Sequence, residues 1–215
     1  MAGPQTIADS KRAFHQAFPH VIAPLHRRVA DELLVELHLL SHQTTFQAGQ
    51  LFAVGLTTVF ERFTQGYRPE EHRSELMTAL CGSNGFDANA LKDDADKAIS
   101  TAATLQGDAL DSWLKELNIQ EGAHYSRLMG VGLFALLEAS ESEVDAEAAE
   151  ELRKRARDLA PTLGLPAERV EKDLSVFASS SERMQQAVEL MNETQAAERR
   201  KKERRLAELA EKSKA

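Results

Sequence analysis

Two histidines four residues apart are the first residues whose spacing could bind a ligand. His38 and His42 would lie on one face of a helix, beside Asp31, and two imidazoles at that spacing can hold a metal ion. The zinc motif His-Glu-x-x-His also needs a glutamate next to the first histidine, which this sequence does not supply. We therefore expect a solvated polar face here and no bound metal.

A second candidate for metal chemistry is Glu121-x-x-His124. This is half of the paired motif that four-helix di-iron carboxylate proteins use. Their chemistry requires a second Glu-x-x-His and two further inward glutamates, and no second copy of the motif occurs. Because Glu121 precedes Gly122, we expect it at the start of a helix, where an acidic residue is ordinary.

The remaining motifs of catalytic chemistry are incomplete. Cys81 is the only cysteine, so it forms no disulfide within the chain, and no histidine has an arguable place beside it. We expect an unreactive thiol and a reducing compartment. Gly130-Val131-Gly132 is too short for a dinucleotide fingerprint and follows no strand. The sequence thus predicts no catalytic residue and no cofactor, which leaves a small helical metal-dependent enzyme as the weaker alternative.

Charge is unevenly distributed along the chain. Residues 193–215 contain eight Lys or Arg and five Glu, a net charge of +3, so the other residues carry −11 of the total −8. An acidic body argues against a nucleic-acid-binding protein. Within residues 147–157 we expect Glu150–Lys154 and Glu151–Arg155 ion pairs, which indicate a solvated face and no acid–base pair.

The basic run near the C-terminus is the candidate partner-binding site. Its six basic residues in seven could attract phosphate or anionic lipid, but the flanking sequence lacks the apolar face of a helix that lies on a membrane. We therefore favour a contact with a protein. The predicted partner-binding residues are Arg199, Arg200, Lys201, Lys202, Arg204 and Arg205.

Apolar residues recur at helical spacing throughout, so we predict an all-α fold, a compact multi-helix bundle with a long, partly projecting C-terminal helix. We divide the chain into a bundle, 1–178, and a charged helix, 179–215, opened by the candidate capping box Ser179-x-x-Glu182. The apolar stripe of that helix ends at Met191. The expected core contains Leu33, Leu37, Phe52, Leu56, Val59, Leu133 and Leu136.

Two further features concern packing and membranes. Gly49 and Gly55 interrupt a helical pattern, which favours close approach of another helix at these positions. The longest uncharged apolar run, 128–137, is half the length that a spanning helix needs, and it predicts a central core helix. The N-terminus has no secretory apolar region.

Five segments form a recognisable ensemble: Ser10–Pro19, Arg27–Leu40, Phe60–Arg73, Leu76–Cys81 and Ala123–Glu138. In this order and approximate spacing they resemble the thylakoid formation protein family, also described as photosystem II biogenesis factors. The resemblance covers about residues 6–140. Beyond residue 140 it rests on helical character and a charged tail.

The resemblance implies a non-enzymatic accessory protein of cyanobacterial type. It implies a peripheral position on the cytoplasmic side of the thylakoid membrane, with a soluble fraction, and a role in photosystem II assembly or repair. The implied partners are FtsH-type membrane protease complexes and photosystem II assembly or repair components. The alternative is an organiser of the thylakoid surface that binds anionic lipid through its basic tail.

Overall fold

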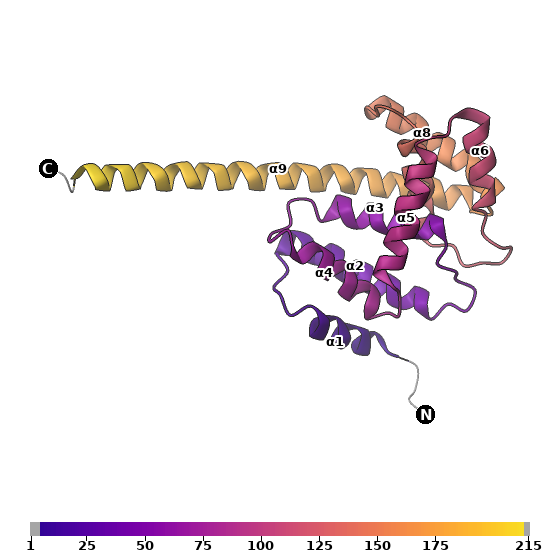
Figure 1. Cartoon of the computed structure of the whole chain (residues 1–215), viewed down its shortest axis with the longest axis horizontal. Coiled ribbons are helices and arrows are strands. Elements are labelled where there is room, and N and C mark those ends of the chain that lie inside the picture. The colour runs from indigo at the N-terminus through magenta and orange to yellow at the C-terminus, as the bar shows by residue number, and fades with distance from the viewer. Residues whose placement is uncertain (1–4, 213–215) are drawn as a thin grey trace.

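Every regular element of the chain is a helix within residues 5–212, the part that the computed structural model describes, with side chains described to residue 205 (Figure 1). The all-α prediction is therefore confirmed. The helices are α1 (Ile7–Ala17), α2 (Pro24–Ser41), α3 (Gln50–Phe63), α4 (His72–Gly82), α5 (Ala88–Ala102), α6 (Gly107–Glu116), α7 (Arg127–Ala139), α8 (Ala146–Leu159), the short 3-10 helix η1 (Ala160–Leu163) and α9 (Ala167–Lys212).

The centre of the bundle is the crossing of α3 and α7, where two glycines bring the backbones into contact. A Cβ on Gly55 would lie 1.7 Å from the carbonyl oxygen of Leu128, and one on Gly132 would lie 1.9 Å from that of Leu51. The expected close approach at Gly55 is thus confirmed. It is wrong at Gly49, which has open space around its Cβ position and stands outside α3 as its N-cap.

The predicted core residues lie in one buried cluster. Leu37, Phe52 and Leu56 have no exposed surface, and Val59, the most exposed of the set, is 8% exposed. Helix α7 is buried at ten successive positions, 128–137, because other helices surround it. The apolar run thus forms the predicted central core helix.

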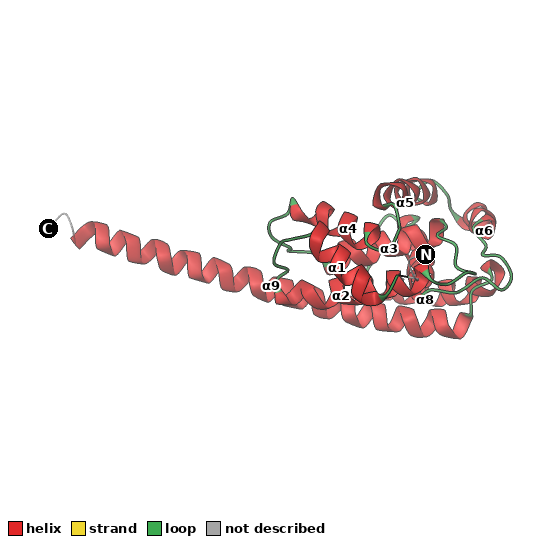
Figure 2. Cartoon of the chain, turned by 90° about the horizontal axis from the view of Figure 1, so that it is seen from below, coloured by secondary structure: helices red, strands yellow, loops and turns green. Residues whose placement is uncertain are grey.

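Helix α9 is one continuous helix of 46 residues (Figure 2). Ser179 lies inside it, and its hydroxyl donates to the carbonyl of Val176 at 3.2 Å, so the predicted capping box at 179 is wrong. The predicted boundary at residue 178 crosses this helix, since Leu174 before it and Met184 after it both pack in the core. Local capping signals misled here because tertiary packing continues the helix through them.

The packed part of α9 ends where the sequence predicted. Gly66, in the loop after α3, has φ +71°, and a Cβ there would lie 3.0 Å from Val188 and 3.3 Å from the Met191 side chain. Every residue from 192 to 205 is exposed. None of the described helices is both long and apolar enough to cross a membrane.

We predict that Leu37→Ala lowers the free energy of unfolding by about 2–5 kcal/mol, because it leaves a cavity in a fully buried position. Chemical denaturation measures the change. A loss below about 0.5 kcal/mol would contradict the burial of Leu37, since surface substitutions lie in that range.

We predict a larger effect from a single methyl group at the helix crossing. Gly55→Ala should cost roughly 3 kcal/mol or more, because the new Cβ meets backbone that cannot rotate away. Gly82→Ala is the matched control: it lies at the end of α4 with nothing near its Cβ position. The control should be neutral or stabilising by up to about 1 kcal/mol, and equal losses in both variants would refute the crossing.

Candidate functional site

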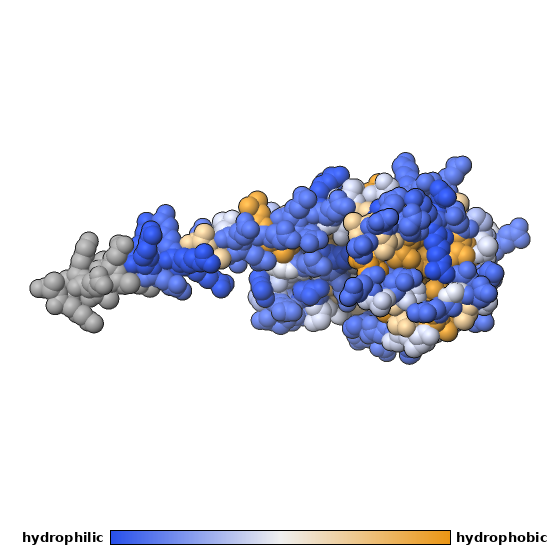
Figure 3. Space-filling view, turned by 90° about the horizontal axis from the view of Figure 1, so that it is seen from above, coloured by the Kyte–Doolittle hydropathy of each residue, from blue (hydrophilic) through white to orange (hydrophobic). Residues whose placement is uncertain are grey.

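The C-terminal part of α9, residues 192–212, projects from the body and is called the arm below. At 1.5 Å per residue it extends about 30 Å. In the space-filling view its described surface is mostly hydrophilic (Figure 3). A helix that is polar all round bridges solvent or awaits a partner.

The six predicted partner-binding residues all lie on the arm and are all exposed: Arg199, Arg200, Lys201, Lys202, Arg204 and Arg205. Among the side chains of residues 5–205, no carboxylate lies within ion-pair distance of these groups. Seven successive helical residues cover about two turns, so the positive charges point around the whole circumference. Such a surface can steer an acidic partner, with strong salt dependence.

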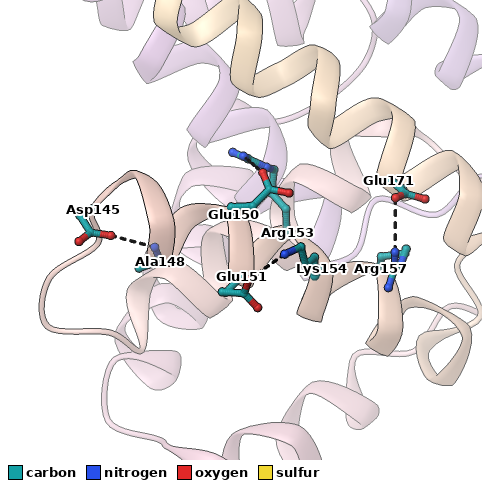
Figure 4. Close-up of polar contacts among 8 residues, drawn as sticks. All are labelled: Asp145, Ala148, Glu150, Glu151, Arg153, Lys154, Arg157 and Glu171. Atoms are coloured by element: carbon teal, nitrogen blue, oxygen red, sulfur yellow. Dashed lines mark hydrogen bonds and ion pairs between the residues drawn. The ribbon is translucent and has the colours of Figure 1, made fainter.

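Helix α8 carries a network of ion pairs on its surface (Figure 4). Glu150 pairs with Arg153, and the Glu151 carboxylate accepts from Lys154 Nζ at 2.8 Å. The pairs therefore join residues three apart, and the predicted Glu150–Lys154 and Glu151–Arg155 pairs are wrong in their partners.

The other two bases of α8 reach neighbouring helices. Arg155 donates to Asp111 of α6 at 2.7 Å, and Arg157 lies 3.4 Å from Glu171 of α9. Because these carboxylates pair with bases, α8 offers the solvated, salt-bridged face that the sequence predicts.

His38 is buried, so the predicted solvated face is wrong for this residue. Its Nδ1 lies 2.9 Å from the Ser10 hydroxyl, which joins α1 to α2 inside the protein. Burial, and secondarily the neighbouring His42, holds the pKa of His38 below its usual value. Residue spacing within α2 could not predict this burial, because α1 covers that face of the helix.

The remaining sequence candidates are the Glu121-x-x-His124 motif and Cys81. Glu121 and His124 lie in the loop before α7, so the predicted helix start at Glu121 is wrong, and the His124 amide donates to the Thr45 carbonyl at 3.1 Å. Cys81 is fully buried, and burial, with a smaller contribution from Asp87, raises its pKa to about 12. Its thiol therefore stays protonated and unreactive at neutral pH.

Close packing explains why glycine occupies positions 130 and 132. Gly132 allows the helix crossing described above. A Cβ on Gly130 would lie 2.9 Å from the Tyr125 hydroxyl, which donates to Asp173 of α9 at 2.9 Å. Burial, followed by the charge of Asp173, raises the pKa of Tyr125. The glycine pair therefore makes room for packing, and the absence of a preceding strand in the described chain agrees with this role.

One cluster escaped the sequence analysis because its members come from separate segments. His20 follows α1, whereas His72 and Glu75 lie on the first turn of α4, and their ligand atoms all lie within 4.8 Å of one another. His20 Nε2 is 3.2 Å from Glu75 Oε2. The two imidazole rings stack with centroids 3.7 Å apart and planes inclined by 19°. Nearly parallel rings do not aim their nitrogens at a common point, so one ion could join them only after the stack opened.

We predict that the purified protein retains no stoichiometric zinc or iron after dialysis. The measurement is elemental analysis before and after exposure to excess Zn²⁺. Retained metal that is lost in His20→Ala would refute the prediction at the surface cluster. Metal lost in His38→Ala or His124→Ala would refute it at the sites considered from the sequence.

Comparison with known proteins identifies the family. Residues 6–206 match the family described as Thylakoid formation protein. The chain is 70% identical over 211 residues to Protein Thf1 of Parasynechococcus marenigrum strain WH8102, with 98% of each chain covered, and 61% identical to Protein Thf1 of Synechococcus sp. strain CC9902, with 97% of each covered.

A solved structure of Psb29 is also similar, with a TM-score of 0.75 and 34% identity over 93% of this chain and 99% of that chain. The similarity therefore includes the arrangement of the helices as well as the sequence. The matches extend over nearly the whole chain, including the region beyond residue 140 where the sequence resemblance was weakest. The chain belongs to the thylakoid formation protein family.

Proposed function

We propose that this protein is a non-enzymatic accessory factor of thylakoid biogenesis and of photosystem II assembly or repair. It acts by binding a membrane-bound FtsH-type protease complex, at the cytoplasmic side of the thylakoid membrane. The family supports the thylakoid role, and the similarity to Psb29 supports the link to the photosystem. The arrangement of the carboxylates and the thiol supports a binding protein: Glu150 and Glu151 of α8 pair with bases, and Cys81 is buried.

The exposed arm is the observation that carries this proposal. The chain continues a core-packed helix about 30 Å beyond the body, although every residue from 192 to 205 is exposed. Between residues 192 and 205, only Ala196 and Ala197 are apolar. Because this surface is basic and lacks an apolar face, it fits an acidic protein surface better than insertion among lipids.

We expect truncation after Met191 to separate stability from binding. Because the removed residues include no described buried side chain, the unfolding midpoint should change little. Recovery of the FtsH-type protease from solubilised thylakoids, measured by immunoblot, should fall strongly. Lower stability with intact recovery would mean that the arm folds against the body. Unchanged stability with unchanged recovery would make the arm a solvated terminus.

Charge reversal tests the basic run without shortening the chain. Substitution of Arg199, Arg200, Lys201 and Lys202 by Glu should weaken recovery, most clearly at low salt. The control reverses four exposed lysines of the body that form no ion pair within the described chain: Lys11, Lys97, Lys115 and Lys172. Equal losses in both variants would refute a specific role of the arm. Salt-sensitive flotation with anionic liposomes, lost only in the arm variant, would favour the lipid-binding alternative.

A further inference from the structure

A long open groove lies on the body between α2 and the first half of α9. It has a volume of about 1550 Å³. Buried side chains of α3 and α7 form its floor, among them Val59, Phe63 and Val131. This groove lies on the packed part of α9, before the arm begins.

The two walls of the groove carry apolar residues at helical spacing. On α2 these include Leu25, Val29 and Leu39, and on α9 they include Val176 and Met184. Leu39 is 58% exposed and Val176 is 51% exposed, so one strongly exposed apolar side chain lies on each wall. Since the floor is apolar too, the groove presents apolar side chains on its floor and on both walls, which is typical of a protein-binding site.

The charges along the α2 wall are already paired. Arg27 lies 3.5 Å from Asp31, and Arg28 lies 2.8 Å from Glu32. Glu36, further along α2, accepts from the guanidinium of Arg127 at the start of α7 at 2.8 Å. This wall therefore offers little net charge to a ligand.

The α9 wall differs, because neither of its two charges, Asp173 and Arg183, forms an ion pair with a side chain of residues 5–205. Asp173 accepts the hydrogen bond of Tyr125. Arg183 lines the groove, is exposed, and forms no ion pair with any side chain of residues 5–205. The unmatched positive charge of the groove is therefore the Arg183 guanidinium, and a carboxylate is its natural partner.

We propose that this groove binds an amphipathic helix of a partner protein, which lays an apolar stripe on the groove floor and places a carboxylate against Arg183. The apolar stripe of α2 runs from Leu25 to Leu39, about 21 Å at the rise of an α-helix. An occupant of about four turns, with apolar residues three and four apart, would match that length. This is the helix-in-groove mode of recognition.

The other kinds of occupant fit less well. The arm of a second copy lacks an apolar stripe over its described side chains, so it could not cover the groove floor. The volume exceeds the roughly 300–1,000 Å³ that is usual for small-molecule sites. A bilayer is a broad surface and would contact the rims of the groove before its floor. The inference goes beyond the proposed role of the arm, because the groove belongs to the body.

Photocross-linking in the full-length protein tests the proposal. A benzophenone amino acid replaces Leu39 in one variant and Val176 in another, each as the sole copy in cyanobacterial cells, and mass spectrometry identifies the linked peptides. We expect both walls to link to the same segment of one partner protein, through residues three or four apart in an amphipathic stretch with an acidic residue. Val21, which is 92% exposed and lies outside the groove, is the control position.

Charge reversal supplies the second measurement. Arg183→Glu should lower the cross-linking yield from position 176 by about fivefold to tenfold, because it replaces attraction with repulsion. Lys172→Glu, on an exposed part of α9 outside the groove, should leave the yield unchanged. Circular dichroism and the unfolding midpoint show that each variant is folded.

Several outcomes of these experiments would contradict the groove proposal. The proposal is wrong if the folded variants link only to lipid, only to a second copy of this chain, or to nothing. It is also wrong if the two walls link to unrelated segments, or if Arg183→Glu and Lys172→Glu behave alike. Cross-linking in the chain truncated after Met191 separates the two proposals, because loss of the arm should leave the groove occupied whether or not the arm binds a protease.

Discussion

The contact between the backbones of α3 and α7 is the constraint on which the rest of the bundle depends. At Gly55 and Gly132 each helix fills the space that a side chain would occupy on the other. Backbone contact of this kind leaves no rotamer that could relieve a larger residue. The close crossing lets α7 be buried on all sides, so that the remaining helices can pack around it.

Helix α9 extends from the packed body into the projecting arm. Its first half is held by core contacts of Val170, Leu174 and Met184, whereas the described side chains from residue 192 to 205 are all exposed to solvent. Starting a helix is the costly step, and extending one that is already formed costs little. The packed half can therefore supply the nucleus for the arm, which explains how a polar segment stays helical at a distance from the body.

The two candidate binding surfaces differ in chemistry. Over its described side chains, residues 192–205, the arm is basic and has no apolar face, so it suits long-range attraction of an acidic partner. The groove between α2 and α9 is concave and apolar with one unmatched guanidinium, so it suits the burial of a helix. Because they lie on successive parts of α9, a single partner could engage both, and linked weak contacts would then reinforce one another.

Local periodicity in the sequence determined the helical class, the buried set around Leu37 and the end of the packed stripe at Met191, because each depends on residues within one helix. The sequence alone also identified Gly55 as a place of close approach. Only the tertiary structure decided that α9 runs unbroken through Ser179, that the buried His38 is hydrogen-bonded to Ser10 of α1, and that His20 lies against Glu75. It likewise brought α2 beside α9 to form the groove. The physical reason is that helical spacing states which face of a segment is polar or apolar, whereas packing decides which distant segment covers that face.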